Sequence, residues 1–281
     1  MNAIIASLKD PAGMLIRKKL IENFGFGEKE EEFDGSRVFG KGNFRLFTIK
    51  EDQIFADYAD GIEAELLIFA SRHFSKTGPK TLTVHAPGNW GKAEYGGREK
   101  TLCPTYASVI KNYLLALDEK AKEMKLEHEV VLEQTHHGPL LSKPAVFIEL
   151  GSRPEHYGDE KAAELIAEVI IGETRFGKCR AGIGIGGKHY NSEFTKLLLR
   201  ADYALGHMCP EYALKDLNKE MLEQAYAKTK ENVECIVLDY KGIGSGEEKQ
   251  RVKRLAEDFA KEKGIEVIRA RNVLGKLKEI K

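Results

Sequence analysis

The chain has 281 residues, of which 42% are hydrophobic and 31% are charged, a composition typical of globular proteins rather than disordered ones. Its 44 basic and 44 acidic residues cancel, so net charge does not signal an anionic partner, which would need a local basic patch. The four cysteines form no CxxC pair, the N-terminus lacks the apolar run of a signal peptide, and no segment has the roughly 20 apolar residues of a membrane span. We therefore expect a cytoplasmic protein without a disulfide framework, a zinc finger or a membrane-spanning segment.

The first half of the chain predicts short strands and two amphipathic helices. Pro11 stands at a suitable first position for the first helix. Charged and glycine residues over positions 25–42 predict an irregular connection. The predicted strands cover residues 3–8, 44–49, 66–70 and 82–85, and the predicted helices cover residues 11–24 and 106–125.

The second half alternates strands with helices more regularly. Such alternation predicts an α/β fold with a mainly parallel sheet covered on both faces. No repeat or linker marks a domain boundary, so we expect a single catalytic unit over residues 1–281, with residues 1 to about 127 as a candidate N-terminal lobe. The predicted strands cover residues 129–133, 145–150, 180–185, 203–207, 234–239 and 266–269, and the predicted helices cover residues 159–171, 192–200, 217–229 and 247–263.

Five histidines and one glutamate fall at predicted strand ends, where the reactive groups of such sheets collect. Most are flanked by Gly or Pro, which lets backbone approach closely. Imidazole and carboxylate are the ligands of catalytic zinc and also serve as acid and base near pH 7. The predicted metal-site residues are His85, His136, His137, Glu149, His189 and His207.

Each of these histidines, taken singly, is equally consistent with a loop residue or a hydrogen-bonded core residue. His128 lies between two glutamates and is expected at a solvated strand edge, and His156 lies in a charged turn. His73 closes a buried strand and could face the same crevice, so its role stays open.

Two glycine-rich stretches invite a nucleotide-binding interpretation. Gly182-x-Gly184-x-x-Gly187 matches the dinucleotide fingerprint, but no helix begins at its last glycine. The loop of residues 242–246 precedes a helix and is either a plain turn or a contact for a terminal tRNA phosphate. Cys209 near His207 is a weaker alternative, a cysteine nucleophile without an identifiable base.

Several of these segments together resemble the D-aminoacyl-tRNA deacylases of the archaeal and plant type, over nearly the whole chain. The Thr-His-His-Gly-Pro and Gly-Gly-x-His-Tyr blocks are specific in combination. The chain departs from the family pattern at Asn191-Ser192, where Ala-Pro is expected, and at Cys209, where a larger apolar residue is expected. The segments that carry the resemblance are residues 70–73, 85–90, 135–139, 147–152, 184–190 and 206–207.

The resemblance implies a three-layer α/β/α fold of the phosphorylase/hydrolase type, with a mixed, mainly parallel sheet. It also implies a monomeric, zinc-associated enzyme that hydrolyses the ester between a D-amino acid and the 3′ end of tRNA. The products would be free tRNA and the free D-amino acid, so the enzyme would act in translation quality control.

Residue chemistry suggests how such an ester is cleaved. We expect some of the predicted ligands to hold zinc, whose bound water attacks the ester carbonyl. Glu149, or a histidine such as His137 or His189 that does not bind the metal, would act as base, and the amides of Gly186 and Gly187 would donate to the oxyanion. The rival mechanism is metal-free, with histidines positioning water and the substrate's own groups assisting.

A loop rich in basic and aromatic residues is the expected contact for the tRNA substrate. Trp90 and Tyr95 could stack on the terminal adenine, while Lys92, Arg98 and Lys100 could contact the backbone. The alternative is a mobile charged loop. Two other functions stay open: a zinc aminopeptidase or amidohydrolase indifferent to tRNA, and an RNA-binding protein without catalysis.

Overall fold

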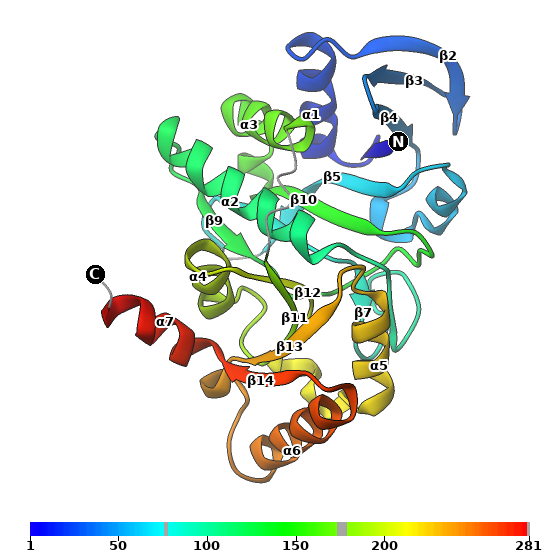
Figure 1. The fold of residues 1–281 in the computed structure, drawn as a ribbon. Helices are drawn as coiled ribbons and strands as arrows, with labels where there is room; N and C mark the ends of the chain where they lie inside the picture. The colour runs from blue at the N-terminus through cyan, green and yellow to red at the C-terminus, as the bar shows by residue number, and fades with distance from the viewer. Residues whose placement is uncertain (76–77, 173–178, 280–281) are drawn as a thin grey trace.

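The computed structural model describes residues 1–75, 78–172 and 179–279, and these residues form two β-sheets and a short ribbon (Figure 1). The large sheet has eight strands in the order β2-β3-β4-β1-β5-β10-β6-β9. Its strands are β1 (Asn2–Ser7), β2 (Gly27–Phe33), β3 (Ser36–Lys41), β4 (Phe44–Ile49), β5 (Leu66–Phe74), β6 (Thr81–His85), β9 (Glu129–Leu132) and β10 (Ala145–Ser152). The small sheet has the order β12-β11-β13-β14, with β11 (Arg180–Ile185), β12 (Tyr203–Cys209), β13 (Val233–Leu238) and β14 (Glu266–Arg269). The ribbon pairs β7 (Gly88–Asn89) with β8 (Thr101–Leu102).

Strand direction in the large sheet changes between β10 and β6. Strands β4, β1, β5 and β10 run parallel to one another, whereas β6 is antiparallel to β10 and β9 is parallel to β6. The small sheet is entirely parallel. The predicted α/β fold with a mixed, mainly parallel sheet is therefore confirmed.

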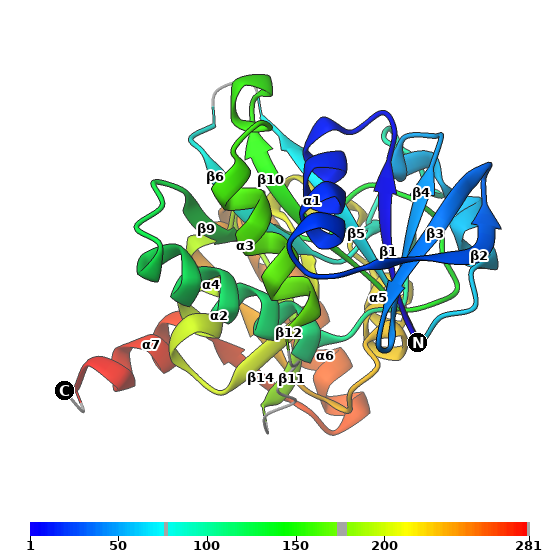
Figure 2. The same cartoon turned by 90° about the horizontal axis from the view of Figure 1, so that it is seen from above.

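Helices cover the sheets unequally. Three helices pack on one face of the large sheet: α1 (Pro11–Glu22), α2 (Ala107–Glu123) and α3 (Glu160–Ile171) (Figure 2). The hydrophobic core between these helices and the sheet continues to α4 (Ser192–Arg200) and to the small sheet. Helices α5 (Lys219–Lys228) and α6 (Gly246–Lys263) cover the other face of the small sheet, which gives three layers there. The opposite face of the large sheet carries no long helix among the described residues: loops and the 3₁₀ helices Gln53–Phe55 and Asp57–Gly61 cover it.

Local sequence explains where the helices begin. The side chain of Asp10 accepts a hydrogen bond from the amide of Gly13, and Pro11 occupies the first turn of α1. Asp159 caps α3 in the same way. None of the described helices is long and apolar enough to cross a membrane.

One prediction about regular elements was wrong: strands β2 and β3 form a hairpin within residues 25–42, where an irregular connection was expected. Helix α7 (Ala270–Glu279) follows the last predicted strand, in a stretch for which no element was predicted. The large sheet takes strands from residues 2–152, so it extends past residue 127. The division of the chain into a lobe and a catalytic unit stays a prediction.

Candidate active site

The candidate site begins on the helix-free face of the large sheet. Alternation along β5, β6 and β10 turns His73, His85 and Glu149 to the face that also carries Phe147, while the intervening residues fill the helix-covered core. Because β6 runs opposite to β10, its carboxyl end returns beside the middle of β10, and His85 pairs with Phe147. Glu149 and His73 therefore lie within strands on a sheet face, and not beyond strand ends as the sequence suggested.

Two loops bring the remaining groups to this face. The segment after β9 carries Glu133, His136 and His137, and the loop after β11 carries His189. An isolated bridge between Glu133 and Tyr190 joins the two loops at the junction of the sheets. The side-chain amide of Gln134 donates to the carbonyls of residues 186, 187 and 188, which fixes the second loop.

Glu133 is the centre of the resulting cluster. Its buried carboxylate lies 2.8 Å from Nε2 of His189, 3.0 Å from Nδ1 of His73 and 3.5 Å from Nε2 of His136. Glu149 lies 3.2 Å from Nδ1 of His73 and 3.8 Å from Nε2 of His85. Nε2 of His73 also contacts the hydroxyl of Tyr190.

Charge in the cluster is distributed unevenly. Burial alone would lower the pKa of His73, but Glu133 and Glu149 outweigh burial and raise that pKa to about 11. Burial would raise the pKa of Glu149, but the neighbouring imidazoles of His73 and His85 lower it to about 2. Burial lowers the pKa of His137 to about 4 and also lowers that of His136, so both rings are neutral at pH 7. The site thus combines ionised carboxylates and a cationic His73 with two neutral imidazoles.

Three overlapping groups of side chains have ligand atoms within 4.8 Å of one another, as a bound metal ion would require. In the all-imidazole group, Nδ1 of His85, His136 and His137 lies 3.1, 2.8 and 2.6 Å from a backbone carbonyl oxygen. A carbonyl can only accept, so Nδ1 carries the proton in each ring, and in the neutral rings of His136 and His137 Nε2 keeps a lone pair, the arrangement usual for zinc-binding histidines. Burial alone would lower the pKa of His85, but Glu149 raises it, so a metal ion would have to displace a proton from this ring. Nε2 of His85 is buried without a hydrogen-bond partner among the described residues. The three groups are His85/His136/His137, Glu133/His136/His189 and His73/Glu133/Glu149.

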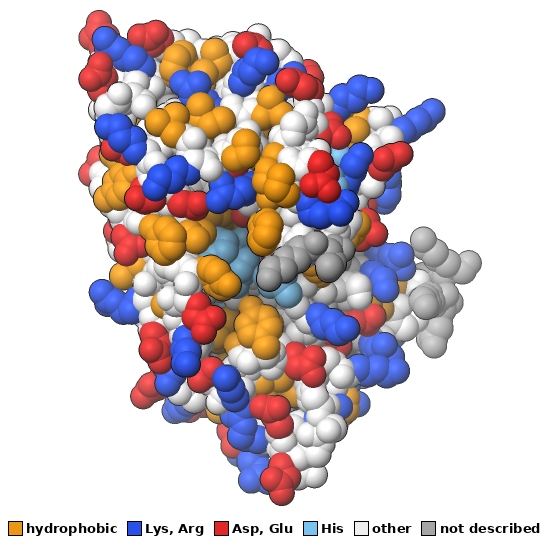
Figure 3. Space-filling model, turned by 180° about the vertical axis from the view of Figure 1, so that it is seen from behind, with side chains coloured by type: hydrophobic (Ala, Val, Ile, Leu, Met, Phe, Trp, Pro, Cys, Tyr) orange, Lys and Arg blue, Asp and Glu red, His pale blue; other side chains and the backbone are white. Residues whose placement is uncertain are grey.

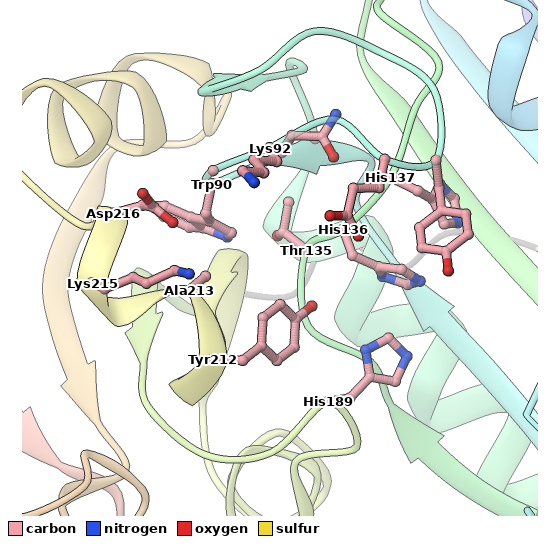
Figure 4. Close-up of a pocket in the computed structure, with 15 residues that line it drawn as sticks. Trp90, Lys92, Thr135, His136, His137, His189, Tyr212, Ala213, Lys215 and Asp216 are labelled. Atoms are coloured by element: carbon pink, nitrogen blue, oxygen red, sulfur yellow. The ribbon is translucent and has the colours of Figure 1, made fainter.

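Two cavities meet at this cluster, and Tyr95, His136, His137 and His189 line both of them. The tryptophan cavity has a volume of about 570 Å³ and is also lined by Trp90, Lys92, Tyr212, Lys215 and Asp216, among others (Figure 4). The arginine cavity has a volume of about 670 Å³ and is also lined by Asp10, Asp52, Arg72, Phe74 and Tyr157, among others. From outside, the histidines lie at the bottom of a hollow rimmed by hydrophobic side chains (Figure 3).

Most of the predicted site residues lie together, but three do not serve as expected. His207 is fully buried and belongs to none of the three groups, and its Nδ1 lies 3.3 Å from the hydroxyl of Thr135. The amide of Gly186 donates to the carbonyl of Cys209 and the amide of Gly187 donates to that of Gly242. Neither amide is available to an oxyanion, so that prediction was wrong.

The predicted tRNA-binding residues divide into two sets. Trp90, Tyr95 and Lys92 line the tryptophan cavity, although Trp90 is only 2% exposed and donates its indole N–H to the carbonyl of Met208. Arg98 and Lys100 are exposed and line neither cavity.

Sequence reasoning missed Glu133 and Tyr212 and left His73 undecided. Glu133 could have been identified as a site residue from the sequence, because it ends a predicted strand and stands directly before Gln-Thr-His-His, which contains two candidate ligands. No sequence signal points to Tyr212, because this residue lies in a segment without a motif. The 3₁₀ helix Glu211–Asp216 brings it to the cluster.

Comparison with known proteins places the chain among related sequences. The family model of D-aminoacyl-tRNA deacylase matches residues 60–268. The D-aminoacyl-tRNA deacylases of Pyrococcus furiosus and Thermococcus kodakarensis are each 40% identical to this chain over 96% of its length and 100% of theirs. A crystal structure described as a conserved protein of unknown function superposes with a TM-score of 0.87 at 35% identity, covering 97% of this chain and 96% of that one. The chain therefore belongs to the D-aminoacyl-tRNA deacylase family.

Proposed function

We propose that this chain hydrolyses the ester between a D-amino acid and the 3′ end of tRNA, releasing free tRNA and the D-amino acid. The observation that carries the proposal is the convergence of five histidines and two buried glutamates where two cavities meet. An aminoacyl ester is activated, so positioned water, a base and charge stabilisation suffice for its hydrolysis.

His189 is the best candidate for the general base. A carboxylate oxygen of Glu133 accepts from its Nε2, which leaves Nδ1 as the nitrogen that can take a proton. Nδ1 of His189 makes no hydrogen bond to the described part of the chain, and the ring lines both cavities. In this proposal Nδ1 takes a proton from the attacking water, and Glu133 stabilises the imidazolium that forms.

The predicted zinc ion has a plausible place beside this pair. His85, His136 and His137 would hold it: His136 and His137 offer the neutral Nε2 of rings whose pKa burial lowers, and His85 would lose a proton on binding the ion. Zinc held there would supply a Lewis acid next to the ester. Glu149 is assigned to positioning His73 and His85 rather than to the metal, and His207 is left out of the ligand set.

The remaining expectations follow from the proposed substrate. Aminoacyl-tRNA is a cytoplasmic molecule, so the proposal places the protein in the cytoplasm. Trp90, Tyr95 and Lys92 are proposed to contact the 3′ end of the tRNA, and the monomeric state stays a prediction. Among the described residues of the site, no contact specifically favours the aminopeptidase or the non-catalytic alternative.

The decisive experiment incubates the protein with D-tyrosyl-tRNA and L-tyrosyl-tRNA in parallel, with and without a chelator, and follows amino acid release. Rapid cleavage of the D form alone that stops on metal removal is expected. D-selective cleavage that survives verified metal removal would keep the function and remove zinc from the proposal. Cleavage of neither form by folded, zinc-supplemented protein would contradict the function itself.

A further inference from the structure

We infer that the two cavities divide the substrate between them. The tryptophan cavity takes the 3′-terminal adenosine and the arginine cavity takes the D-aminoacyl group, with Tyr212 and Phe74 as the residues that sense each half. The inference rests on the proposed function, because it assumes an ester that joins an amino acid to a nucleoside.

The two cavities share a wall of histidine rings. His136, His137 and His189 line both cavities, so a bond held at these rings has space on either side. A substrate cleaved there must have two parts that leave in different directions. An aminoacyl ester of adenosine has such a shape, with the ester carbonyl between two bulky groups.

Exposed aromatic side chains surround this wall. Tyr95, Phe74 and Tyr212 are 67%, 61% and 58% exposed. They are three of the seven large hydrophobic residues that the described chain leaves exposed, and all three line these cavities. Exposed apolar side chains gathered at one place mark a binding surface. Figure 4 shows the ring of Tyr212 beside His136 and His189, in a position to stack on a base.

Charged side chains in the two cavities would orient the substrate. The tryptophan cavity contains the ammonium groups of Lys92 and Lys215, together with the carboxylates of Glu94 and Asp216. Its cations suit the phosphate that links the terminal adenosine to the rest of the tRNA.

The arginine cavity has more carboxylates than cations. Its lining includes the carboxylates of Asp10, Asp52 and Glu149, against the guanidinium of Arg72, which is bound to Asp52 at 2.7 Å, and the imidazolium of His73. An excess of carboxylates suits the α-ammonium group of an aminoacyl ester. Phe74, Tyr157 and Ile54 supply apolar surface for its side chain.

Two stable amide analogues test the division: 3′-deoxyadenosine carrying a 3′-amide-linked D-tyrosyl group and its D-alanyl counterpart. Calorimetric titration measures their affinity for wild-type protein and for the variants Tyr212→Leu and Phe74→Ala. Tyr212→Leu is expected to weaken both analogues equally, by about tenfold. Phe74→Ala is expected to weaken the D-tyrosyl analogue about tenfold and the D-alanyl analogue less than about twofold. Met124→Ala, which changes an exposed apolar residue outside both cavities, is the matched control.

Three results would overturn the inference. They are a reversed pattern between the two variants, equal affinities in all proteins, and no binding of either analogue to the wild type. Hydrolysis of D-tyrosyl-tRNA by the wild type is measured separately. Analogue binding with the expected pattern but without ester hydrolysis would refute the proposed function and leave the division of the cavities standing.

Discussion

The carboxylate of Glu133 holds the two halves of the site together. It is fully buried and contacts His73, His136 and His189, which come from a strand and from two separate loops. A buried anion is stable only when it is paired, so the three imidazoles and Glu133 depend on one another.

Replacing Glu133 by glutamine should therefore impair catalysis without removing the metal. Glu133→Gln is expected to lower kcat by about 100-fold with little change in KM, because His189 loses the carboxylate that orients its ring and stabilises the imidazolium formed in the reaction. Zinc content should stay that of the wild type. Steady-state kinetics and metal analysis of the purified variant measure both.

Glu129→Gln is the matched control, since Glu129 is exposed at the start of β9, the strand that ends directly before Glu133. Its kcat is expected to stay within about twofold of the wild type. A Glu133→Gln variant that keeps wild-type kcat would remove His189 and Glu133 from the proposed mechanism, and loss of zinc would make Glu133 a ligand instead.

His207 affects stability rather than chemistry. Burial lowers its pKa from the ordinary 6.5 to about 3 in the folded chain. Between these pH values the unfolded chain binds a proton that the folded chain does not. Stability is therefore lost as pH falls below about 6.5, by about 1.4 kcal/mol for each pH unit from this residue.

His207→Asn should make the free energy of unfolding less dependent on pH between 7 and 5, because the acid-sensitive group is gone. Urea unfolding at both pH values measures this slope for the wild type and the variant. Leu205→Val, a neighbouring buried change without a titratable group, should keep the wild-type slope. An unchanged slope in His207→Asn would show that His207 is protonated to the same extent in both states.

Residue type and position predicted many of the residues of the site, but not which groups contact one another in the folded chain. Histidines beside Gly and Pro stood out because few other residues serve as ligand and base near neutral pH. Glu133 did not stand out, because the sequence does not show that the strands bring three imidazoles around it. The amides of Gly186 and Gly187 looked free for the same reason, since their acceptors at Cys209 and Gly242 lie far along the chain.

At the scale of elements, the loop between β7 and β8 is held in place rather than mobile. Asn89 donates to the carbonyls of Gly96 and Arg98, and the amide of Lys100 donates to the carbonyl of Gly91. A fixed backbone presents Lys92, Arg98 and Lys100 without a large ordering cost on binding.

Alanine at Lys92, Arg98 and Lys100 together should weaken tRNA binding and flatten its salt dependence. Each lost phosphate contact reduces the slope of log affinity against log salt by about 0.7 to 0.9. Filter binding at several salt concentrations gives the slope. Lys29, Lys41 and Lys50, exposed around the β2–β3 hairpin, provide a triple-alanine control, and an equal slope in both triple variants would remove this loop from the tRNA contact.

The elements missed from the sequence lie at the margins of the fold. Strand β2 reads Gly-Glu-Lys-Glu-Glu-Glu-Phe, and its charges hide it because an edge strand exposed to solvent needs no apolar face. Helix α7 packs on α4 at the end of the chain. The interior strands were predicted well, because buried strands must be apolar on the faces they bury.

At the scale of the whole molecule, the site forms only when both sheets are folded. His85 comes from the large sheet, and His136 and His137 follow strand β9 of that sheet. The bridge between Glu133 and Tyr190 ties the segment after β9 to the loop after β11. An ion bound by these histidines would favour the folded chain over the unfolded one. Metal binding should therefore be visible as global stability, independently of activity.

Zinc should raise the melting temperature of protein that has first been stripped of metal. At a free concentration of about 100 times its Kd, zinc adds about 2.7 kcal/mol, which corresponds to a rise of several degrees in a chain of this size. The double variant His136→Ala, His137→Ala should lose the rise, because one imidazole cannot replace three. His128→Ala should keep it, since His128 lies outside the three candidate groups. A zinc-induced rise that persists in the double variant would move the metal to Glu133, Glu149 and His73, whereas no rise in the wild type would leave a metal-free site in which Glu133 and His189 activate water alone.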